Sequence, residues 1–133
     1  MRKKKNEKPS VKASVSQKKT RVSSKETLYP YIKKQYLKSN HACRVTFRLP
    51  KEAAQGAKHV MVVGDFNGWD TNVSPMKRIK TGDFKLTMNL PCNREYRFRY
   101  LIDGNQWEND WCADKYVPNN FGCNDSVVIV YPD

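Results

Sequence analysis

Apolar and polar residues alternate with a period of two along much of the chain beyond residue 42. Three runs show the alternation most plainly: Cys43 to Leu49, Phe84 to Leu90 and Tyr96 to Asp103. One apolar face and one wetter face along each run are typical of antiparallel strands that cover a single core. Two other runs, His59 to Val63 and Val127 to Tyr131, are more continuously apolar, and we expect them to be central strands.

Turn residues separate these runs. The sequence reads D-F-N-G at 65–68, T-G-D at 81–83, D-G-N at 103–105 and N-N-F-G at 119–122. Two shorter strands, at 76–79 and near Trp107, complete the set. Short strands in this number, with little helix, predict an all-β fold, an immunoglobulin-like β-sandwich that spans residues 42–133.

The segment 28–41 has a different period. Pro30 suits the first turn of a helix, and Tyr29, Ile32, Tyr36 and Leu37 would then share roughly one face. The spacing predicts a short helical lead-in that packs on the sandwich.

Charge is concentrated at the N-terminus. The 133 residues carry 25 Lys and Arg against 13 Asp and Glu, a net charge of +12. Residues 1–27 hold ten of the basic and two of the acidic side chains and no aromatic residue. A segment this polar cannot offset the entropy of ordering, so we expect it to be disordered. A solubilising tail is the plainer interpretation, and nucleic-acid binding by this basic tail is the alternative.

Several classes of protein are excluded or disfavoured. A catalytic barrel of about 250 residues does not fit in the chain. There is no apolar run of about 20 residues that would span a membrane and no apolar stretch typical of a secretory signal, so we expect a cytoplasmic protein. The four cysteines, Cys43, Cys92, Cys112 and Cys123, are too widely spaced for a zinc site, and we expect reduced thiols and no metal.

Catalytic motifs are absent from the sequence. His41 and His59 are the only histidines, and no G-x-S-x-G, P-loop or H-E-x-x-H pattern accompanies them. Four aspartates that could act as acid and base lie in predicted turns, where Asp commonly organises the backbone: Asp65, Asp103, Asp110 and Asp114. We therefore expect a protein that is not an enzyme and uses no cofactor.

The tryptophans carry more information. Trp69, Trp107 and Trp111 all fall outside the alternating core positions. A tryptophan in a turn either folds under as a lid on the core or is displayed as a flat platform. A displayed indole suits sugars, because the apolar C–H face of a pyranose ring can lie on it. Pattern alone leaves both alternatives open.

Four stretches in order resemble a known family. They read V-G-D-F-N-G-W-D at 63–70 with P-M at 75–76, Y-R-F-R-Y-L-I-D-G-N-Q-W at 96–107, F-G at 121–122 and S-V-V-I-V at 126–130. Together they closely resemble family 48 of the carbohydrate-binding modules, the isoamylase early-set or glycogen-binding domain. The segments at 32–38 and 45–54 look like its small stand-alone bacterial members.

The resemblance implies an early-set β-sandwich that binds α-glucan without catalysis. In binding members the two tryptophans matching Trp69 and Trp107 stack on successive glucose rings, and a basic residue at the place of Arg99 bonds sugar hydroxyls. An apolar side chain and an Asn near the last strand close the site. The implied carbohydrate-binding residues are Trp69, Arg99, Trp107, Phe121, Asn124 and Asp125.

Three departures from the family pattern leave a second interpretation open. Asp125 stands where an Asn is usual, Arg99 where a Lys is usual, and Trp111 with Cys112 follows Asp110 in place of small residues or Pro. The Asp removes a donor and adds a charge, while the Arg replaces a point donor with a planar fork. The alternative is an adaptor that docks a glycogen-metabolising enzyme or other protein and keeps only a vestigial sugar site.

Overall fold

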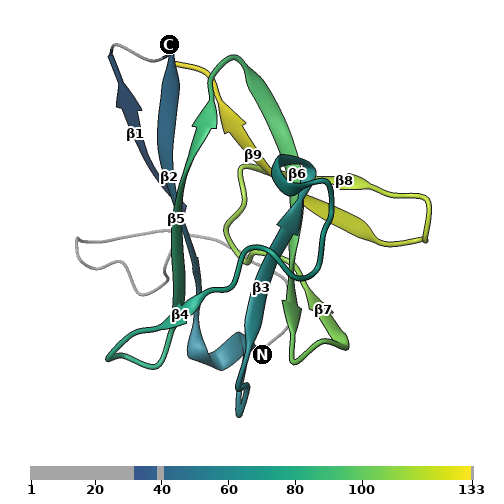
Figure 1. Ribbon diagram of the computed structural model, residues 1–133. Helices are drawn as coiled ribbons and strands as arrows, with labels where there is room; N and C mark the ends of the chain where they lie inside the picture. Colours follow the sequence, from purple (N-terminus) through teal and green to yellow (C-terminus); the bar gives the residue numbers. More distant parts are fainter. Residues whose placement is uncertain (1–31, 39–40, 133) are drawn as a thin grey trace, which may run out of the picture.

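The computed structural model describes residues 32–38 and 41–132. The basic tail 1–27 and the first residues of the predicted helical lead-in lie outside these ranges. Two antiparallel sheets face one another as a β-sandwich, which confirms the predicted fold class (Figure 1). In the part of the chain that the structure describes, no helix is long and apolar enough to cross a membrane.

The first sheet has the strand order β1-β2-β5-β4. Its strands are β1 (Lys33–Leu37), β2 (Ala42–Leu49), β4 (Lys77–Arg78) and β5 (Phe84–Pro91). The second sheet has the order β3-β6-β9-β8, with β7 paired to β6 as well. Its strands are β3 (Val60–Gly64), β6 (Arg94–Ile102), β7 (Gln106–Glu108), β8 (Lys115–Pro118) and β9 (Asn124–Val130). Two 3₁₀ turns, η1 (Lys51–Ala53) and η2 (Asp65–Asn67), complete the structure.

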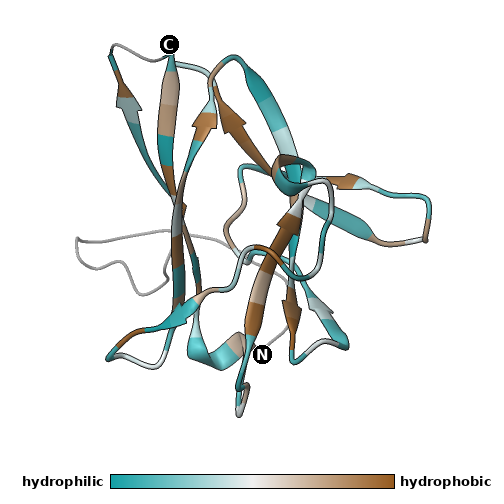
Figure 2. Cartoon of the chain, viewed as in Figure 1, coloured by the Kyte–Doolittle hydropathy of each residue, from teal (hydrophilic) through white to brown (hydrophobic). Residues whose placement is uncertain are grey.

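Alternation along the strands builds the core. Every second residue of β2 is buried, as is every second residue of β6 from Tyr96 to Ile102. The aromatic rings of Phe47 and Phe98 meet edge to face with centroids 5.0 Å apart. Figure 2 shows apolar segments alternating with polar ones along these strands. Phe66, from η2, packs against the same core. One apolar layer between two sheets therefore leaves each sheet an outer face for other uses.

The predicted helical lead-in is wrong where the structure describes it. Residues Lys33–Leu37 form a strand that pairs with β2 in register from Lys33–Thr46 to Leu37–Ala42. A helix of about 12 residues gains little by itself in water, whereas the open edge of β2 offers a backbone partner for each second residue. The edge of β2 thus overrides the helical spacing.

The expected central position of the strand near 59–63 is also wrong. β3 is an edge strand, although β9 does lie between β6 and β8 as expected. The segment 74–76 covers the free side of β3, because Val62 N donates to Ser74 O at 3.0 Å and Met76 N to Val60 O at 2.8 Å. Val62 and Val63 point to opposite faces and both are buried. The continuous apolar run therefore reports burial on both faces and not a central place in the sheet.

Gly64 ends β3 at a point where no side chain fits. A Cβ atom there would lie 2.4 Å from the Arg97 carbonyl oxygen and 2.7 Å from Cβ of Phe98. The φ of Gly64 is −173°, which is ordinary extended backbone. The close approach of β3 to β6 is thus the reason for glycine, and it brings the following turn against β6.

Candidate functional site

The outer face of the second sheet gathers three of the six predicted site residues, Arg99, Trp107 and Asp125. Along β6, Tyr96, Phe98 and Tyr100 point into the core, so Arg97 and Arg99 point outward. The register pairs Trp107 of β7 with Leu101, on the same side as the arginines. It also pairs Val127 of β9 with Arg97, which places Asp125, two residues earlier, on this face. We call the set Arg97, Arg99, Trp107 and Asp125 the outer-face cluster.

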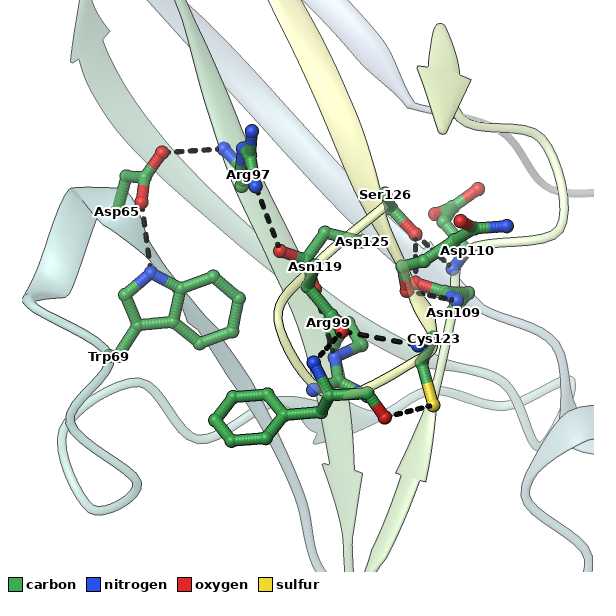
Figure 3. Close-up of polar contacts among 12 residues, drawn as sticks. Asp65, Trp69, Arg97, Arg99, Asn109, Asp110, Asn119, Cys123, Asp125 and Ser126 are labelled. Atoms are coloured by element: carbon green, nitrogen blue, oxygen red, sulfur yellow. Dashed lines mark hydrogen bonds and ion pairs between the residues drawn. The ribbon is translucent and has the colours of Figure 1, made fainter. Parts of the chain in front are cut away.

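Asp125 is the centre of the outer-face cluster. Its side chain is only 6% exposed, and its carboxylate lies 3.3 Å from Nε of Arg99 and 3.7 Å from a terminal nitrogen of Arg97. Asn119 donates a hydrogen bond of 3.0 Å to the same carboxylate (Figure 3). Nε of Arg99 is buried and makes no hydrogen bond with the described residues. Its contact with Asp125, at 3.3 Å, is an ion pair without hydrogen-bond geometry. The Asp that departs from the family pattern therefore compensates two cations.

Trp107 lies beneath Arg99. The guanidinium carbon of Arg99 is 4.9 Å from the centroid of the indole, within the range of a cation–π contact. Trp107 is nevertheless 40% exposed, while the Arg99 side chain is only 16% exposed. Asp125 thus positions Arg99, and Arg99 in turn positions an indole that keeps much of its surface open to solvent.

Trp69 is fixed by the turn that follows β3. Asn67 accepts a hydrogen bond from Gly64 N and donates to Val62 O and to Ser74 Oγ, which closes the turn. Gly68 and Trp69 then both have positive φ, 66° and 60°, a conformation that glycine adopts freely and tryptophan rarely does. The backbone of the D-F-N-G-W motif therefore determines where the indole is placed.

Asp65 connects this indole to β6. Its carboxylate accepts one hydrogen bond from Trp69 Nε1 at 2.9 Å and another from Arg97 N at 2.8 Å, and Figure 3 shows both. Trp69 is half-buried, so it is less open than Trp107. Both tryptophans are thus held beside β6: Trp69 through the carboxylate of Asp65, and Trp107 through the pairing of β7 with β6.

The loop between β8 and β9 brings in Phe121. The side-chain oxygen of Asn119 accepts hydrogen bonds from Phe121 N at 2.8 Å and Cys123 N at 3.2 Å, while its amide donates to Asp125. Phe121 is 83% exposed at the tip of this loop. Asn124 does not join the cluster, because alternation along β9 directs its side chain to the face opposite Asp125.

The sequence predicts no positioning role for Asn119 or Arg97, and for Asp65 it predicts only a role within its turn. The signal for Asn119 was the N-N-F-G turn, because an Asn side chain at such a place commonly binds backbone N–H groups two residues on. Arg97 had the same outward phase as Arg99 but no motif of its own. The acid and base alternative for the four aspartates gains nothing from the structure, since each accepts backbone hydrogen bonds: Asp65, Asp103, Asp110 and Asp114.

Trp111 lies in the segment between β7 and β8. It is 44% exposed, and its Nε1 donates to Glu108 at 3.1 Å. The four cysteines are free thiols, and burial raises the pKa of Cys112 to about 11. Among residues 32–38 and 41–132, no group of three His, Cys, Asp or Glu side chains could hold a metal ion.

A buried polar group lies on the core side of the same sheet. Asp110 is 3% exposed; its carboxylate accepts hydrogen bonds from the Tyr100 hydroxyl at 2.6 Å and from Cys112 N at 2.7 Å. Burial raises the pKa of Asp110 to about 6, although these two hydrogen bonds work in the opposite direction. The folded protein therefore binds a proton at Asp110 more tightly than the unfolded chain does.

Replacing Asp110 with Asn should remove a pH dependence of stability. Between pH about 4 and about 6 the folded state binds more protons at Asp110 than the unfolded state does. The contribution of Asp110 to the free energy of unfolding therefore falls as pH rises, by about 3 kcal/mol in total. Urea denaturation of both proteins at pH 4 and pH 7 measures the effect. We expect the free energy of unfolding of the Asn variant to rise relative to that of the parent protein between pH 4 and pH 7. A difference that stays constant with pH would contradict the raised pKa of Asp110.

Comparison with known proteins identifies relatives of the chain. A family described as the glycogen recognition site of AMP-activated protein kinase matches residues 33–130. A 1,4-alpha-glucan branching enzyme, GlgB, from Butyrivibrio fibrisolvens is 63% identical over 65 residues, which are 48% of this chain and 10% of the enzyme. The match to the family extends from β1 to the last residue of β9 and so covers both sheets. The chain belongs to this family of glycogen-recognition modules.

Proposed function

We propose that the chain binds α-glucan on the outer face of the second sheet and catalyses no reaction on it. The observation that carries the proposal is the stack of Arg99 on Trp107, held by the buried Asp125 beside an indole that remains 40% exposed. Trp107 and Trp69 are the proposed platforms for glucose rings, and Arg99 is the proposed donor to sugar hydroxyls. Phe121, at the exposed loop tip, would close one side of the site.

The size of the platforms predicts weak binding of short chains. If each indole hides about 80–100 Å² of apolar area, two platforms supply ~4–5 kcal/mol. Hydrogen bonds to hydroxyls add little net because water is displaced from both partners. Lost translational and rotational freedom subtracts several kcal/mol, so we expect dissociation constants of tens of micromolar to millimolar for maltooligosaccharides. A polymer such as glycogen would bind better through many sites at once.

Affinity electrophoresis of the intact chain tests the proposal. Native gels that contain glycogen should retard the protein relative to gels without polymer, and gels that contain a soluble cellulose derivative should not. The retardation should persist as salt is raised, because stacking on an indole depends little on ionic strength. Equal mobility in all three gels would reject glucan binding.

An adaptor role is the second candidate, and one observation favours it. Arg97 and Arg99 are both engaged by Asp125, a residue that departs from the family pattern and adds a negative charge to the site. A vestigial sugar site would leave a folded module whose partner is another protein, such as a glycogen-metabolising enzyme. Purification with a stoichiometric protein partner, combined with no retardation by glycogen, would select this role. Location in the cytoplasm is part of both proposals.

A further inference from the structure

The outer face of the first sheet, on the opposite layer from the outer-face cluster, is strongly basic. The register places Arg48 of β2 opposite Lys85 of β5, and Lys85 opposite Lys77 of β4, so three cations form one row across the sheet. Arg44 lies on this face as well, because it alternates along β2 with Val45 and Phe47, which point into the core. Lys33 of β1 joins them, because the register pairs it with Thr46, which also points outward. We call these five residues the cationic face: Lys33, Arg44, Arg48, Lys77 and Lys85.

Most of these charges have no acidic partner in the described part of the chain. Arg48 forms an ion pair with Asp83 at 2.9 Å, and Arg44 donates to the neutral amide of Gln35 at 3.3 Å. Among residues 32–38 and 41–132, Lys33, Lys77 and Lys85 form no ion pair. Like charges directly opposite one another destabilise a sheet. The Lys77–Lys85 pair therefore costs stability in the free protein, and an anion bound across it would remove that cost.

The groups between the cations are hydrogen-bond donors as well. Thr46 and Thr87 face one another with hydroxyl oxygens 2.9 Å apart in the middle of the sheet, and the register continues with Gln35, Arg44 and Asn89 in the next row. Lysine, arginine, hydroxyl and amide donors at regular strand spacing suit the oxygens of repeated phosphate groups. The outward positions of β2, β4 and β5 hold no aromatic side chain. Stacking on unpaired bases is therefore unavailable to these three strands, which favours a duplex over a single strand.

The chain before this sheet carries further positive charge. Residues 1–27 carry a net charge of +8, and the first described strand after them, β1, is the edge strand of the same sheet. A long polyanion is long enough to contact both the cationic face and the basic residues 1–27, whereas a short acidic peptide would contact the cationic face alone. We propose that the cationic face binds the phosphate backbone of double-stranded nucleic acid without base specificity.

A salt series with matched variants of the full chain tests this proposal. The probe is a fluorescently labelled DNA duplex, followed by anisotropy between about 50 mM and about 200 mM salt. The test variant is Lys77→Gln with Lys85→Gln. The control is Lys58→Gln with Lys115→Gln, two lysines outside the cationic face, one exposed in the loop before β3 and one paired with Glu95 on the second sheet. Both double variants have the same net charge.

We expect the test variant to bind the duplex at least about tenfold more weakly and to lower the slope of log affinity against log salt by about two. The control should lose less than about threefold. Equal losses in both variants, or none in either, would overturn the proposal, because binding would then follow total charge or the tail alone. Binding of poly-glutamate that depends on Lys77 and Lys85 as strongly as DNA binding does would overturn it too, in favour of an acidic protein.

Two further readouts separate this proposal from the others. The melting temperature of the test variant should equal or exceed that of the parent protein, since the substitutions remove a like-charge pair. Retardation by glycogen should be unchanged, because the cationic face and the outer-face cluster lie on opposite layers (Figure 1). A variant that loses DNA binding only because it unfolds would fail both readouts and would count against the proposal.

Discussion

Replacing Trp107 with Ala is expected to weaken glycogen binding by about 30-fold while the protein remains folded. The change removes one stacking face, worth about 2 kcal/mol for 80–100 Å² of apolar area. It also removes the ring on which Arg99 rests, so the guanidinium loses a contact at 4.9 Å. Affinity electrophoresis across a glycogen series gives the dissociation constant, and far-ultraviolet circular dichroism reports the fold.

Trp69→Ala should cause a loss of similar size, and the double variant should show no retardation. Trp111→Ala is the matched control: Trp111 is exposed to about the same degree as Trp107 and also donates a hydrogen bond from its indole nitrogen, but it lies outside the proposed platforms. We expect the control to bind glycogen as the parent protein does. Undiminished binding by both folded platform variants would reject the stacking mechanism.

Asp125→Ala is expected to lower the free energy of unfolding by about 3 kcal/mol. The substitution leaves the half-buried Arg99 without its counter-charge and also removes the acceptor of the Asn119 amide. Removing one partner of a buried ion pair is costly because the other charge stays desolvated. Urea denaturation measures the loss, and Asp125→Asn should lose less, since its oxygen can still accept the hydrogen bond from Asn119.

An exposed ion pair on the same face supplies the control for Asp125. Lys115 and Glu95 lie 2.9 Å apart, but their side chains are 46% and 38% exposed. Exposed pairs contribute little, so Glu95→Gln should change the stability by less than about 1 kcal/mol. If both substitutions lower the free energy of unfolding by the same small amount, burial does not strengthen the contribution of the Asp125 ion pairs to stability.

The strands that the sequence predicted well are those in which side chains alone decide the structure. In β2, β5 and most of β6, buried or half-buried residues that face the core alternate with more exposed ones, so the period of two is a sufficient signal. β1 was misread because its conformation depends on the free edge of β2, which no local pattern encodes. β8 was not predicted, since its four residues gain their partners from β9.

The candidate site was predictable to the same extent. Trp69, Trp107 and Arg99 belong to sequence motifs, and the outward phase of Arg99 could be counted from its strand. The ion pairs of Asp125 could not be foreseen, because β9 and β6 are far apart in sequence and their register is fixed by the whole sheet. The same reason explains Asn119, whose loop reaches the cluster only through the pairing of β8 with β9.

The division of the molecule into two layers has a geometric consequence. One side of each sheet packs against the shared core, so the outer sides of the two sheets face in opposite directions. A large polymer that covers one side leaves the opposite side accessible. Two long chains of different chemistry could therefore be held back to back by a single small sandwich, separated by little more than the thickness of its interior.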